Sequence, residues 1–492
     1  GMGSDAVDME QSGPMIHTPR TGAGSDSADT DSGAAEDAAG STAGDPADGD
    51  AVVGDSATAG PMADFPDARF PRPEHVRGLY VNAWAAGSTN RMAALIDLAR
   101  RTEINAFVID IKDATGYVSH ETSVPLAHQI GATGERRIRD LPGLLDRLLE
   151  EGIYPIARIV VVKDPILAAF RPELAIQDTA GGTWIDSKEI VWLNPYHREV
   201  WKYHVDLARE VAEMGFPEIQ WDYIRFPDAP EADLARAVFT GSEGRSRTEA
   251  IRGFLSYAKE SLSDLPVRST ADVFGVTTSF RRDIGLGQLW ESFIDVVDVA
   301  LPMVYPSHYW EGSFGYSDPN AHPYEVVRAA LRDAVRRSEE VPGAGLTRPW
   351  IQDFTLGQPI YGAAEVRAQI QAAYDVGIQE WILWNPSTRY TESALEPVGG
   401  FETEPLVRVA GVLTPVSRRH LVIDSVAALP PVPDSLDGFL DVDTTAVEVD
   451  TASVKVDTTS VEVDTTAVQV DSAGLVPVEG TMPDSAGVRP RR

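Results

Sequence analysis

Four aspartates stand inside otherwise apolar stretches of the sequence, and their placement is the first sign of chemistry. They are Asp110 in FVIDIKD, Asp222 in WDYIRFPD, Asp272 in ADVFG and Asp353 in IQDF. A carboxylate with apolar neighbours must be desolvated unless it lines a polar cavity, and aspartate is uncommon inside strands. The four together predict a cavity lined by carboxyl groups. For any one of them, the alternative is a buried aspartate bonded to the backbone or to an arginine.

Most glycosidases need two carboxyl groups at the scissile bond, and two neighbouring strands can supply them. One donates a proton to the leaving oxygen, and the other attacks the sugar or activates water. We assign Asp222 as the nucleophile or base, with the nearby Arg225 keeping it ionised. We assign Asp272 as the acid, which requires a pocket that raises its pKa.

Contacts with a carbohydrate are predicted from the other polar and aromatic side chains near these stretches. Sugar rings present apolar C–H faces that stack on aromatic rings, and hydroxyls that bond to polar groups. Trp84 and Trp384 fall at the mouth of the predicted site, whereas Trp221 and Trp381 are expected to pack against helices. For His308, a role in loop structure is an equal alternative. The predicted substrate-binding residues are Asp110, Lys112, Asp113, Trp84, Arg225, Tyr305, His308, Asp353, Trp384 and Asn385.

The elements that must position these residues are eight nearly continuous apolar runs, as expected of strands covered on both faces. The runs are Gly78 to Trp84, Ala106 to Asp113, Tyr154 to Val162, Glu218 to Phe226, Val267 to Val276, Val296 to Tyr305, Pro349 to Thr355 and Glu380 to Pro386. Helical patterns lie between them, at Asn90 to Thr102, Leu141 to Glu151, Arg198 to Met214, Ser246 to Ser261, Tyr324 to Ser338 and Ala363 to Val376, with a short one near Leu289.

Eight alternations of strand and helix over about 310 residues predict an α/β protein, a (β/α)8 TIM barrel. In such barrels the active site lies at the carboxyl ends of the strands, where the aspartates of the sequence fall. The barrel is predicted to extend over residues 65–400.

The acidic charge of the chain is concentrated outside this barrel. The 492 residues carry 42 basic and 75 acidic side chains, a formal charge of −33. Residues 1–64 contain 11 Asp, 2 Glu and 1 Arg, and residues 424–492 contain 10 Asp and 3 Glu against 1 Lys and 3 Arg. Segments so rich in charge and so poor in large apolar residues are predicted to be disordered.

The C-terminal part contains a seven-residue repeat, with aspartates at Asp443, Asp450, Asp457, Asp464 and Asp471. We interpret it as an extended acidic stalk or linker, with a calcium-binding or glycosylated stalk as the alternative. The predicted organisation is a disordered acidic tail at 1–64, the barrel at 65–400, a C-terminal extension or linker at 401–440 and an acidic repeat tail at 441–492.

Composition and missing motifs exclude several classes of function. The electrostatic field of a chain with a net charge of −33 repels the phosphate backbones of nucleic acids, so nucleic acid is not an expected partner. The absence of cysteine removes disulfides and thiolate chemistry. The sequence has no nucleotide-binding glycine motif after its first strand, no HExxH and no GxSxG, so we expect no cofactor and no metal.

Localisation is predicted from the ends of the chain and its apolar runs. No apolar run is long enough for a transmembrane segment, and no secretion signal is present. Gly1 before Met2 is typical of a cloning remnant, so a signal or lipid anchor can have been removed. We expect an exported or cell-surface protein, with a cytoplasmic one as the alternative; the oligomeric state is left open.

Seven motifs in order give a resemblance to a known family. They are RGLYVNAWAAG, FVIDIKDATGYV, IARIVVVKDP, WLNPYHREVWKYHVDLAREVAEMGFPEIQWDYIRFP, STADVFG, LPMVYPSHY and WILWNPS, from about Arg77 to Ser387. This set resembles the putative glycosyl hydrolase domain family, a group of bacterial barrels that is similar, at a distance, to the α-amylase superfamily. The resemblance implies a TIM barrel that acts on a polysaccharide of the cell envelope or extracellular matrix.

The resemblance also bears on the catalytic pair. In amylase-like barrels the nucleophilic aspartate ends the fourth strand, which matches Asp222. The acid on the fifth strand is usually a glutamate, and this chain has Asp272 there. A glycoside hydrolase is therefore the leading hypothesis. The alternatives are a non-catalytic carbohydrate-binding barrel, and a surface scaffold or stalk in which the acidic tails do the work.

Overall fold

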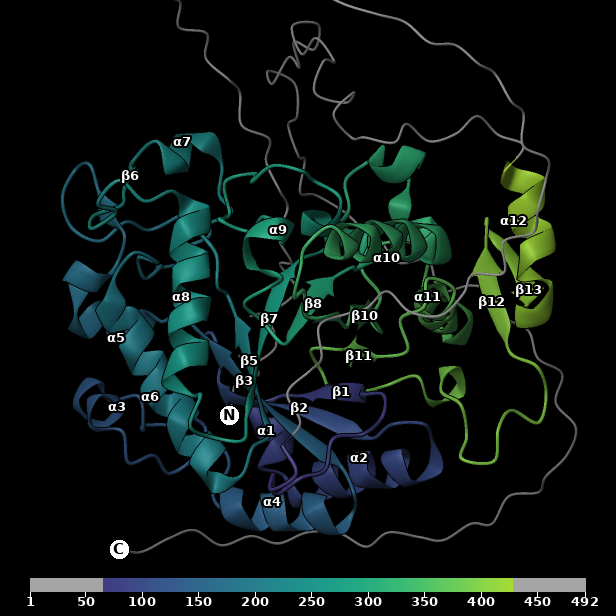
Figure 1. The fold of residues 1–492 in the computed structure, drawn as a ribbon, viewed down its shortest axis with the longest axis horizontal. Coiled ribbons are helices and arrows are strands. Elements are labelled where there is room, and N and C mark those ends of the chain that lie inside the picture. Colours follow the sequence, from purple (N-terminus) through teal and green to yellow (C-terminus); the bar gives the residue numbers. More distant parts are fainter. Residues whose placement is uncertain (1–64, 428–492) are drawn as a thin grey trace, which may run out of the picture. The chain divides into compact units, whose positions relative to one another are not determined.

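A closed ring of parallel strands forms the centre of the described residues (Figure 1). The strand order is β10, β11, β1, β2, β3, β5, β7, β8 and β9, and β10 also pairs with β8, which closes the ring. The short strands β9 and β10 flank Arg348 and Pro349 and together fill one position. The predicted (β/α)8 barrel is therefore confirmed. The strands of the ring are β1 Arg77–Val81, β2 Ala106–Lys112, β3 Tyr154–Val160, β5 Glu218–Asp222, β7 Arg268–Phe274, β8 Val299–Met303, β9 Leu346–Thr347, β10 Trp350–Gln352 and β11 Trp381–Trp384.

The structure is a computed structural model, and it describes residues 65–427. The predicted tails at 1–64 and 441–492, with the heptapeptide repeat, lie outside the described residues. Residues 428–440 of the predicted 401–440 segment lie outside them as well.

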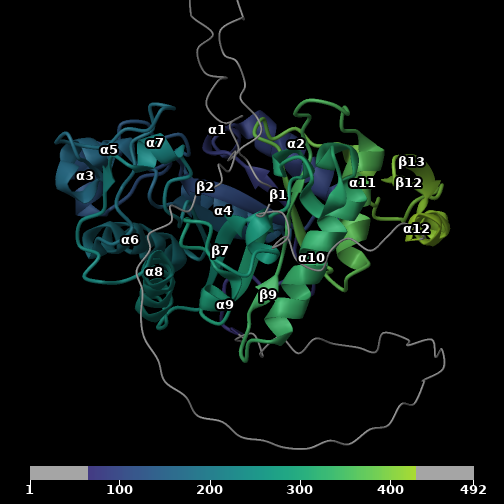
Figure 2. The same cartoon turned by 90° about the horizontal axis from the view of Figure 1, so that it is seen from above.

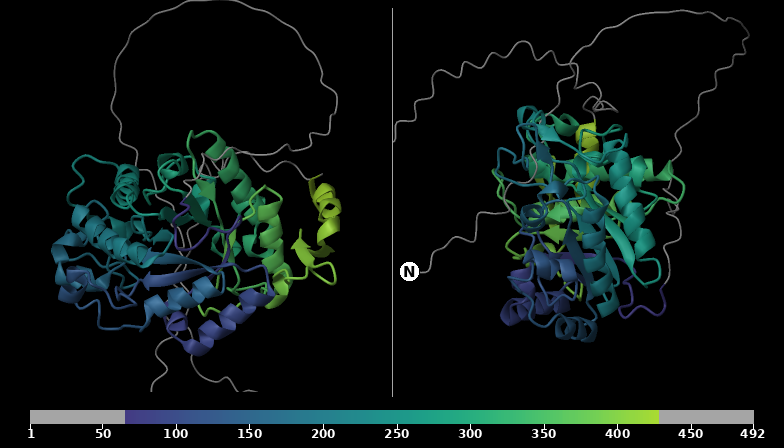
Figure 3. Two further views of the ribbon diagram at one scale, coloured as in Figure 1. Left: turned by 60° about the horizontal axis from the view of Figure 1, so that its bottom comes forward. Right: turned by 90° about the vertical axis from the view of Figure 1, so that its left-hand side faces the viewer.

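Helices surround the barrel, as Figures 2 and 3 show from three further directions. Helix α6 has the bounds expected from its pattern, and it ends at Gly215, whose φ of 114° is the left-handed conformation that glycine adopts most easily. The helices are α1 Ala83–Ala86, α2 Thr89–Arg101, α3 Pro125–Ile130, α4 Leu141–Glu150, α5 Pro165–Phe170, α6 Arg198–Met214, α7 Glu231–Leu234, α8 Arg247–Ser261, α9 Trp290–Phe293, α10 Pro323–Glu339, α11 Ala363–Tyr374 and α12 Arg419–Ala427. Among the helices of this part of the chain, none combines the length and apolar character that a membrane span requires.

The barrel wall is buried on both faces, which explains its nearly continuous apolar runs. Every residue of β2, β3 and β7 is buried. Outward-facing tryptophans join the wall to the helices: Trp221 packs edge-on against Phe254 of α8, and the indole of Trp381 donates a hydrogen bond to Tyr374 of α11. These two tryptophans pack against helices, as expected.

The opposite, amino-terminal end of the barrel is closed by buried ion pairs. Arg348 donates to Glu218 at 2.6 Å and to Glu380 at 2.9 Å. Arg72, from the segment before β1, also pairs with Glu380. Because these charges lie at the end away from the strand-end aspartates, we interpret them as structural.

Residues 401–427 fold against the outside of the barrel. The antiparallel strands β12 Leu406–Val409 and β13 Val412–Pro415 form a hairpin, and α12 follows. Val407 and Val409 are fully buried in a second apolar cluster that includes residues of α10 and α11. Arg408 pairs with Glu365. The described part of the predicted extension, residues 401–427, thus belongs to the folded domain. The only other described strands, β4 Gln177–Asp178 and β6 Ala237–Val238, form a separate short ladder within residues 65–427.

Two valines of this hairpin provide a matched test of its contribution to stability. Val407→Ala removes buried methyl groups, and we expect it to lower the free energy of unfolding by about 1–3 kcal/mol. Val412→Ala, on the facing strand, acts as the control because Val412 is 52% exposed, and we expect a change below about 0.5 kcal/mol. Urea denaturation measures both. Equal effects would show that the hairpin is not packed on the barrel.

Candidate active site

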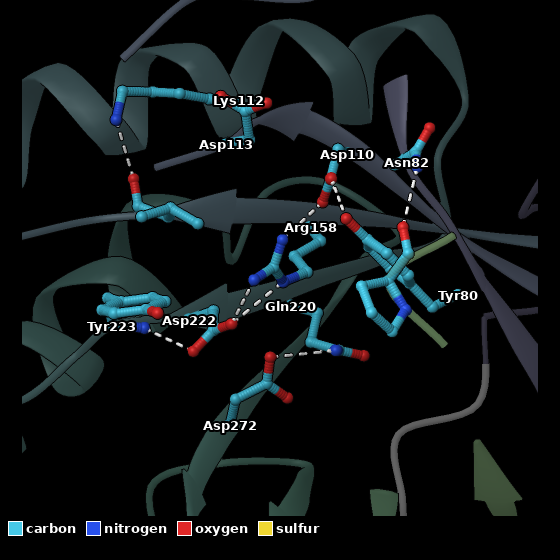
Figure 4. A network of polar contacts seen from close by, with 12 residues as sticks. Tyr80, Asn82, Asp110, Lys112, Asp113, Arg158, Gln220, Asp222, Tyr223 and Asp272 are labelled. Atoms are coloured by element: carbon cyan, nitrogen blue, oxygen red, sulfur yellow. Dashed lines mark hydrogen bonds and ion pairs between the residues drawn. The ribbon is translucent and has the colours of Figure 1, made fainter. Parts of the chain in front are cut away.

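Asp222 and Asp272 lie next to each other at the carboxyl ends of β5 and β7. Asp222 is the last residue of β5, and Asp272 is the fifth residue of β7. Trp221 pairs with Ala271 in the parallel ladder, so the two aspartates that follow are level with each other. Neighbouring strands are about 4.8 Å apart. The structure therefore brings the two predicted catalytic residues together, as Figure 4 shows.

Arg158, on β3, links the carboxylates of this end of the barrel (Figure 4). Its Nε and Nη2 donate to Oδ2 of Asp222 at 2.9 and 2.6 Å, and its Nη1 donates to Oδ1 of Asp110 at 2.6 Å. The Tyr80 hydroxyl, from β1, donates to the other oxygen of Asp110 at 2.5 Å. One chain of hydrogen bonds therefore joins four successive strands of the barrel. Burial raises the pKa of Asp110, and the charge of Arg158 opposes that rise.

The backbone turns immediately after Asp222. Tyr223 has a φ of 51°, a left-handed conformation that is uncommon for an aromatic residue. Its amide donates to Oδ1 of Asp222 at 2.6 Å. The strand predicted to run to Phe226 therefore stops at Asp222, and the carboxylate is held from both sides, by Arg158 and by the backbone, while 6% of the residue stays exposed.

Asp272 lies deeper and in different surroundings. It is 1% exposed, and it accepts hydrogen bonds from Gln220 at 3.1 Å and from the indole of Trp350 at 2.7 Å. Burial raises its pKa well above the ordinary value, and the negative charge of Asp222 raises it further. Arg158 and the two donors act in the opposite direction. The Asp272 carboxyl thus holds its proton more tightly than an exposed one does.

An aromatic wall stands beside the carboxylates. Trp384 stacks on Tyr80 with ring centres 4.0 Å apart, and it meets Trp350 edge to face at 5.4 Å. The guanidinium of Arg158 lies 5.3 Å from the Trp384 ring. Tyr305 is buried nearby, and its pKa is raised by burial and then by the charges of the two aspartates. Such a surface offers rings for stacking and carboxylates for polar contacts.

Lys112 does not reach this cavity. It is fully buried, donates to the Val160 carbonyl at 2.9 Å and pairs with Asp164 at 3.0 Å. The register between β2 and β3 shifts between Asp110 and Lys112, a β-bulge of the kind that re-aims a side chain. Because Lys112 has no exposed surface, its predicted role in sugar binding is corrected to a structural one.

Asp113 and Trp84 belong to a second group at the rim. Asp113 pairs with Arg137, and the Arg137 guanidinium lies 5.0 Å from the ring of Trp84 and 5.8 Å from that of Tyr117. Trp84, in α1 directly after β1, is 64% exposed. The ring is thus free to meet a ligand, and its predicted contact with substrate stays a prediction.

Arg225 is not the cation that contacts Asp222. Its guanidinium lies over aromatic rings, 4.4 Å from Phe274 and 4.9 Å from Trp192. Burial lowers its pKa. Arg158 makes the ion pair with Asp222, whereas Arg225 acts on Asp222 only through its charge, without a direct contact, so the predicted role of Arg225 in keeping Asp222 ionised stays a prediction.

The remaining predicted residues shape two loops. Asp353 accepts from the amide and the hydroxyl of Thr391, and Asn385 donates to the Asp353 carbonyl at 2.6 Å, so both hold the loop after β11. His308 receives or gives a hydrogen bond at Nδ1 with Ser307, and burial lowers its pKa to about 4. Their predicted contacts with substrate stay predictions. Within residues 65–427, no group of three or more His, Asp or Glu side chains is arranged to hold a metal ion.

Comparison with known proteins identifies the family. The family described as "putative glycosyl hydrolase domain" matches residues 78–390, which is more than half of the chain. The chain belongs to this family. A search of curated proteins found no match.

Solved structures similar to this chain come from several bacteria. A hypothetical protein of Ruminiclostridium thermocellum is 41% identical over 40% of this chain and 97% of its own, with a TM-score of 0.36. The PgaB (BpsB) glycoside hydrolase domain of Bordetella bronchiseptica is 14% identical over 64% of this chain and 95% of its own, with a TM-score of 0.45. The glycoside hydrolase domain of PelA from Pseudomonas aeruginosa is 12% identical over 65% and 97%, with a TM-score of 0.37.

Several residues of the candidate site were not predicted from the sequence. Arg158 was the most important, although it stands in the apolar run YPIARIVVV and meets the same criterion that singled out the aspartates. Three other inward-facing residues of the site could not be distinguished from core residues, because nothing in the sequence of their own strands marks them. They are Tyr80, Gln220 and Trp350.

Loss of the Arg158 side chain should destabilise the domain strongly. Arg158→Met leaves Asp110 and Asp222 buried without their cation, and we expect it to lower the free energy of unfolding by about 3–5 kcal/mol. Adding Asp110→Asn should restore part of that loss, because one of the two unpaired charges is removed. Denaturation of the single and double variants measures the coupling. Additive effects of the two substitutions would contradict the interaction of Arg158 with Asp110.

Proposed function

We propose that this domain hydrolyses glycosidic bonds in a polysaccharide of the cell envelope or extracellular matrix, with Asp222 as nucleophile or base and Asp272 as acid. A single observation carries the proposal: the two carboxyl groups are side by side but in opposite electrostatic settings. Carboxyl pairs whose surroundings differ in this way are how glycosidases divide the two roles. A substrate outside the cell fits an exported or cell-surface protein.

Asp222 has the contacts of a carboxylate. The guanidinium of Arg158 is always charged, and it donates two hydrogen bonds to one oxygen of Asp222. The other oxygen is oriented by the Tyr223 amide. A group held in this way is ready to attack an anomeric carbon or to accept a proton from water.

Asp272 has the surroundings of an acid. Burial and the charge of Asp222 raise the pKa of Asp272, so the carboxyl keeps its proton to a higher pH than an exposed carboxyl does and can give it to a leaving oxygen. The aromatic wall of Tyr80 and Trp384 would stack on the sugar that occupies the site.

One observation favours the alternative of a non-catalytic carbohydrate-binding barrel. Asp272 is almost fully buried, and both of its oxygens already accept hydrogen bonds. An aspartate with only a structural role would look the same. The two functions make opposite predictions for the same pair of substitutions.

Asn substitutions at the two aspartates separate these functions. We expect Asp222→Asn and Asp272→Asn each to lower the rate of hydrolysis by about 10²–10⁴-fold. The first substitution removes the nucleophile or base, and the second removes the acid that protonates the leaving oxygen. The measurement is the release of reducing ends from bacterial exopolysaccharides and envelope glycans. Asp295→Asn is the control, since Asp295 pairs with Arg252 before β8, away from the site. Glycan affinity that survives both substitutions, with no product from any polymer, would establish the binding barrel instead.

The pH dependence of hydrolysis should report the proton of Asp272. Because the folded protein raises this pKa, the acid form persists above the ordinary value of about 4 and is lost as the pH rises through the raised value. We expect kcat/KM to fall on the alkaline side with that midpoint, and the residual activity of Asp272→Asn to lack this fall. An unchanged alkaline limb in the variant would assign the acid to another group.

A further inference from the structure

A small pocket opens beyond the ends of β7 and β8, beside the candidate catalytic pair. Its walls include Phe274 at the end of β7, with Gly275 and Val276 after it, and Met303 at the end of β8, with Tyr305 and Tyr309 after it. The cavity volume open to water-sized groups is about 30 Å³, and most of the lining surface is apolar. That volume holds roughly two groups of the size of a water molecule, which is the size of a sugar substituent.

The pocket adjoins the two aspartates. Phe274 follows Asp272 by two residues on β7 and so faces the same side of the strand. Tyr305 lies close enough to Asp222 and Asp272 for both charges to act on its hydroxyl. A sugar placed at the catalytic pair would therefore have one of its substituents at the mouth of the pocket.

One polar group in the wall of the pocket lacks a partner. The Tyr309 hydroxyl has almost no accessible surface, and it finds no hydrogen-bond partner among residues 65–427. Buried hydroxyls without partners are unfavourable and rare, and they call for an explanation such as a ligand. Gly275 leaves room for this hydroxyl, because a Cβ there would lie 2.6 Å from it and 2.4 Å from the Met303 carbonyl oxygen.

No charged side chain lines the pocket. His308, which also borders it, has a pKa lowered to about 4 by burial and is neutral at pH 7. A carboxylate or an ammonium group entering here would lose its hydration without gaining a counter-charge. The pocket suits a small neutral substituent with an apolar end and one hydrogen-bond acceptor.

We propose that this pocket binds the acetyl group of an acetylated sugar, whether an acetamido or an O-acetyl group. The methyl end lies against Phe274, Val276 and Met303, and the Tyr309 hydroxyl, which is buried behind the pocket surface, turns toward the carbonyl oxygen and donates a hydrogen bond to it. The proposal rests on the proposed function, since it assumes that the sugar is positioned at Asp222 and Asp272.

Three probes with a common β-1,4 backbone test the pocket. Chitopentaose carries acetamido groups, O-acetylated cellopentaose carries ester-linked acetyl groups, and cellopentaose carries neither. We expect both acetylated probes to bind at least about tenfold more tightly than cellopentaose, as measured by calorimetry. A difference between the two acetylated probes would tell which linkage the site prefers. Equal affinity for all three, or no binding of either acetylated probe at millimolar concentration, would overturn the proposal.

Variants of the pocket sharpen this test. Tyr309→Phe removes only the unpartnered hydroxyl, so we expect unchanged or higher thermal stability and a three- to tenfold loss of affinity for the acetylated probes alone. Val276→Leu, which adds a methylene group to the wall, should also weaken the acetylated probes. Tyr203→Phe is the matched control, because Tyr203 of α6 is likewise buried with a partnerless hydroxyl among the described residues. Identical affinities in Tyr309→Phe and Tyr203→Phe would contradict the hydrogen bond.

The failure of this proposal can be told apart from the failure of the proposed function. Affinities are measured with Asp222→Asn as background, so they do not depend on turnover. Acetyl-dependent binding that is sensitive to Tyr309→Phe, with no hydrolysis by the unsubstituted protein, would refute the hydrolase and keep the pocket. Hydrolysis of polymers without any preference for acetylated forms would keep the hydrolase and refute the pocket.

Discussion

A buried guanidinium is the interaction on which the carboxyl end of the barrel depends. Arg158 comes from β3, and through Asp110 and Asp222 it reaches the strands on both of its sides; Tyr80 extends the chain to β1. Each of these side chains faces the interior because strand residues alternate between the two sides of the wall. The planar fork of arginine fits two carboxylates at once, which a lysine could not do with the same geometry.

Such a cluster is a poor way to gain stability. Buried ion pairs roughly break even against well-packed apolar side chains of the same volume, because desolvation offsets the attraction. What they provide is orientation. Arg158 and the left-handed turn at Tyr223 act on opposite oxygens of Asp222, so the carboxylate has little freedom to rotate. At the other end of the barrel, Arg348 pairs with Glu218 and Glu380, and Arg72 makes a further pair with Glu380.

The sequence predicted the barrel well because strand burial and helix amphipathicity are local patterns. All eight strand runs and the six long helical patterns correspond to elements of the structure. Several strand ends were predicted too far along the chain. The strand that contains Asp222 stops early because Tyr223 adopts a left-handed backbone conformation, which the sequence does not predict for an aromatic residue. The hairpin of residues 406–415 was missed, although Ala410 and Gly411, both with positive φ, form the kind of tight turn that joins antiparallel strands.

The candidate site was predicted only in part, and the reason is physical. Aspartates in apolar runs can be recognised one strand at a time, and two of them prove to be neighbours. The pairing of Asp222 with Arg158 rather than Arg225 depends on which side chains point inward from different strands, 64 residues apart. The bulge that turns Lys112 toward Asp164 is a property of the ladder between two strands, and neither strand reveals it alone.

The level placement of Asp222 and Asp272 has a stereochemical consequence. The sheet holds the Cα atoms of the two aspartates close to the strand spacing of about 4.8 Å. Glycosidases that keep the anomeric configuration hold their carboxyl groups about 5–5.5 Å apart, whereas inverting enzymes need about 6.5–9.5 Å to admit a water molecule between them. The contacts that turn Asp222 toward Arg158 and Asp272 toward Gln220 and Trp350 therefore set the carboxyl separation, and with it the stereochemical outcome of any reaction that this pair carries.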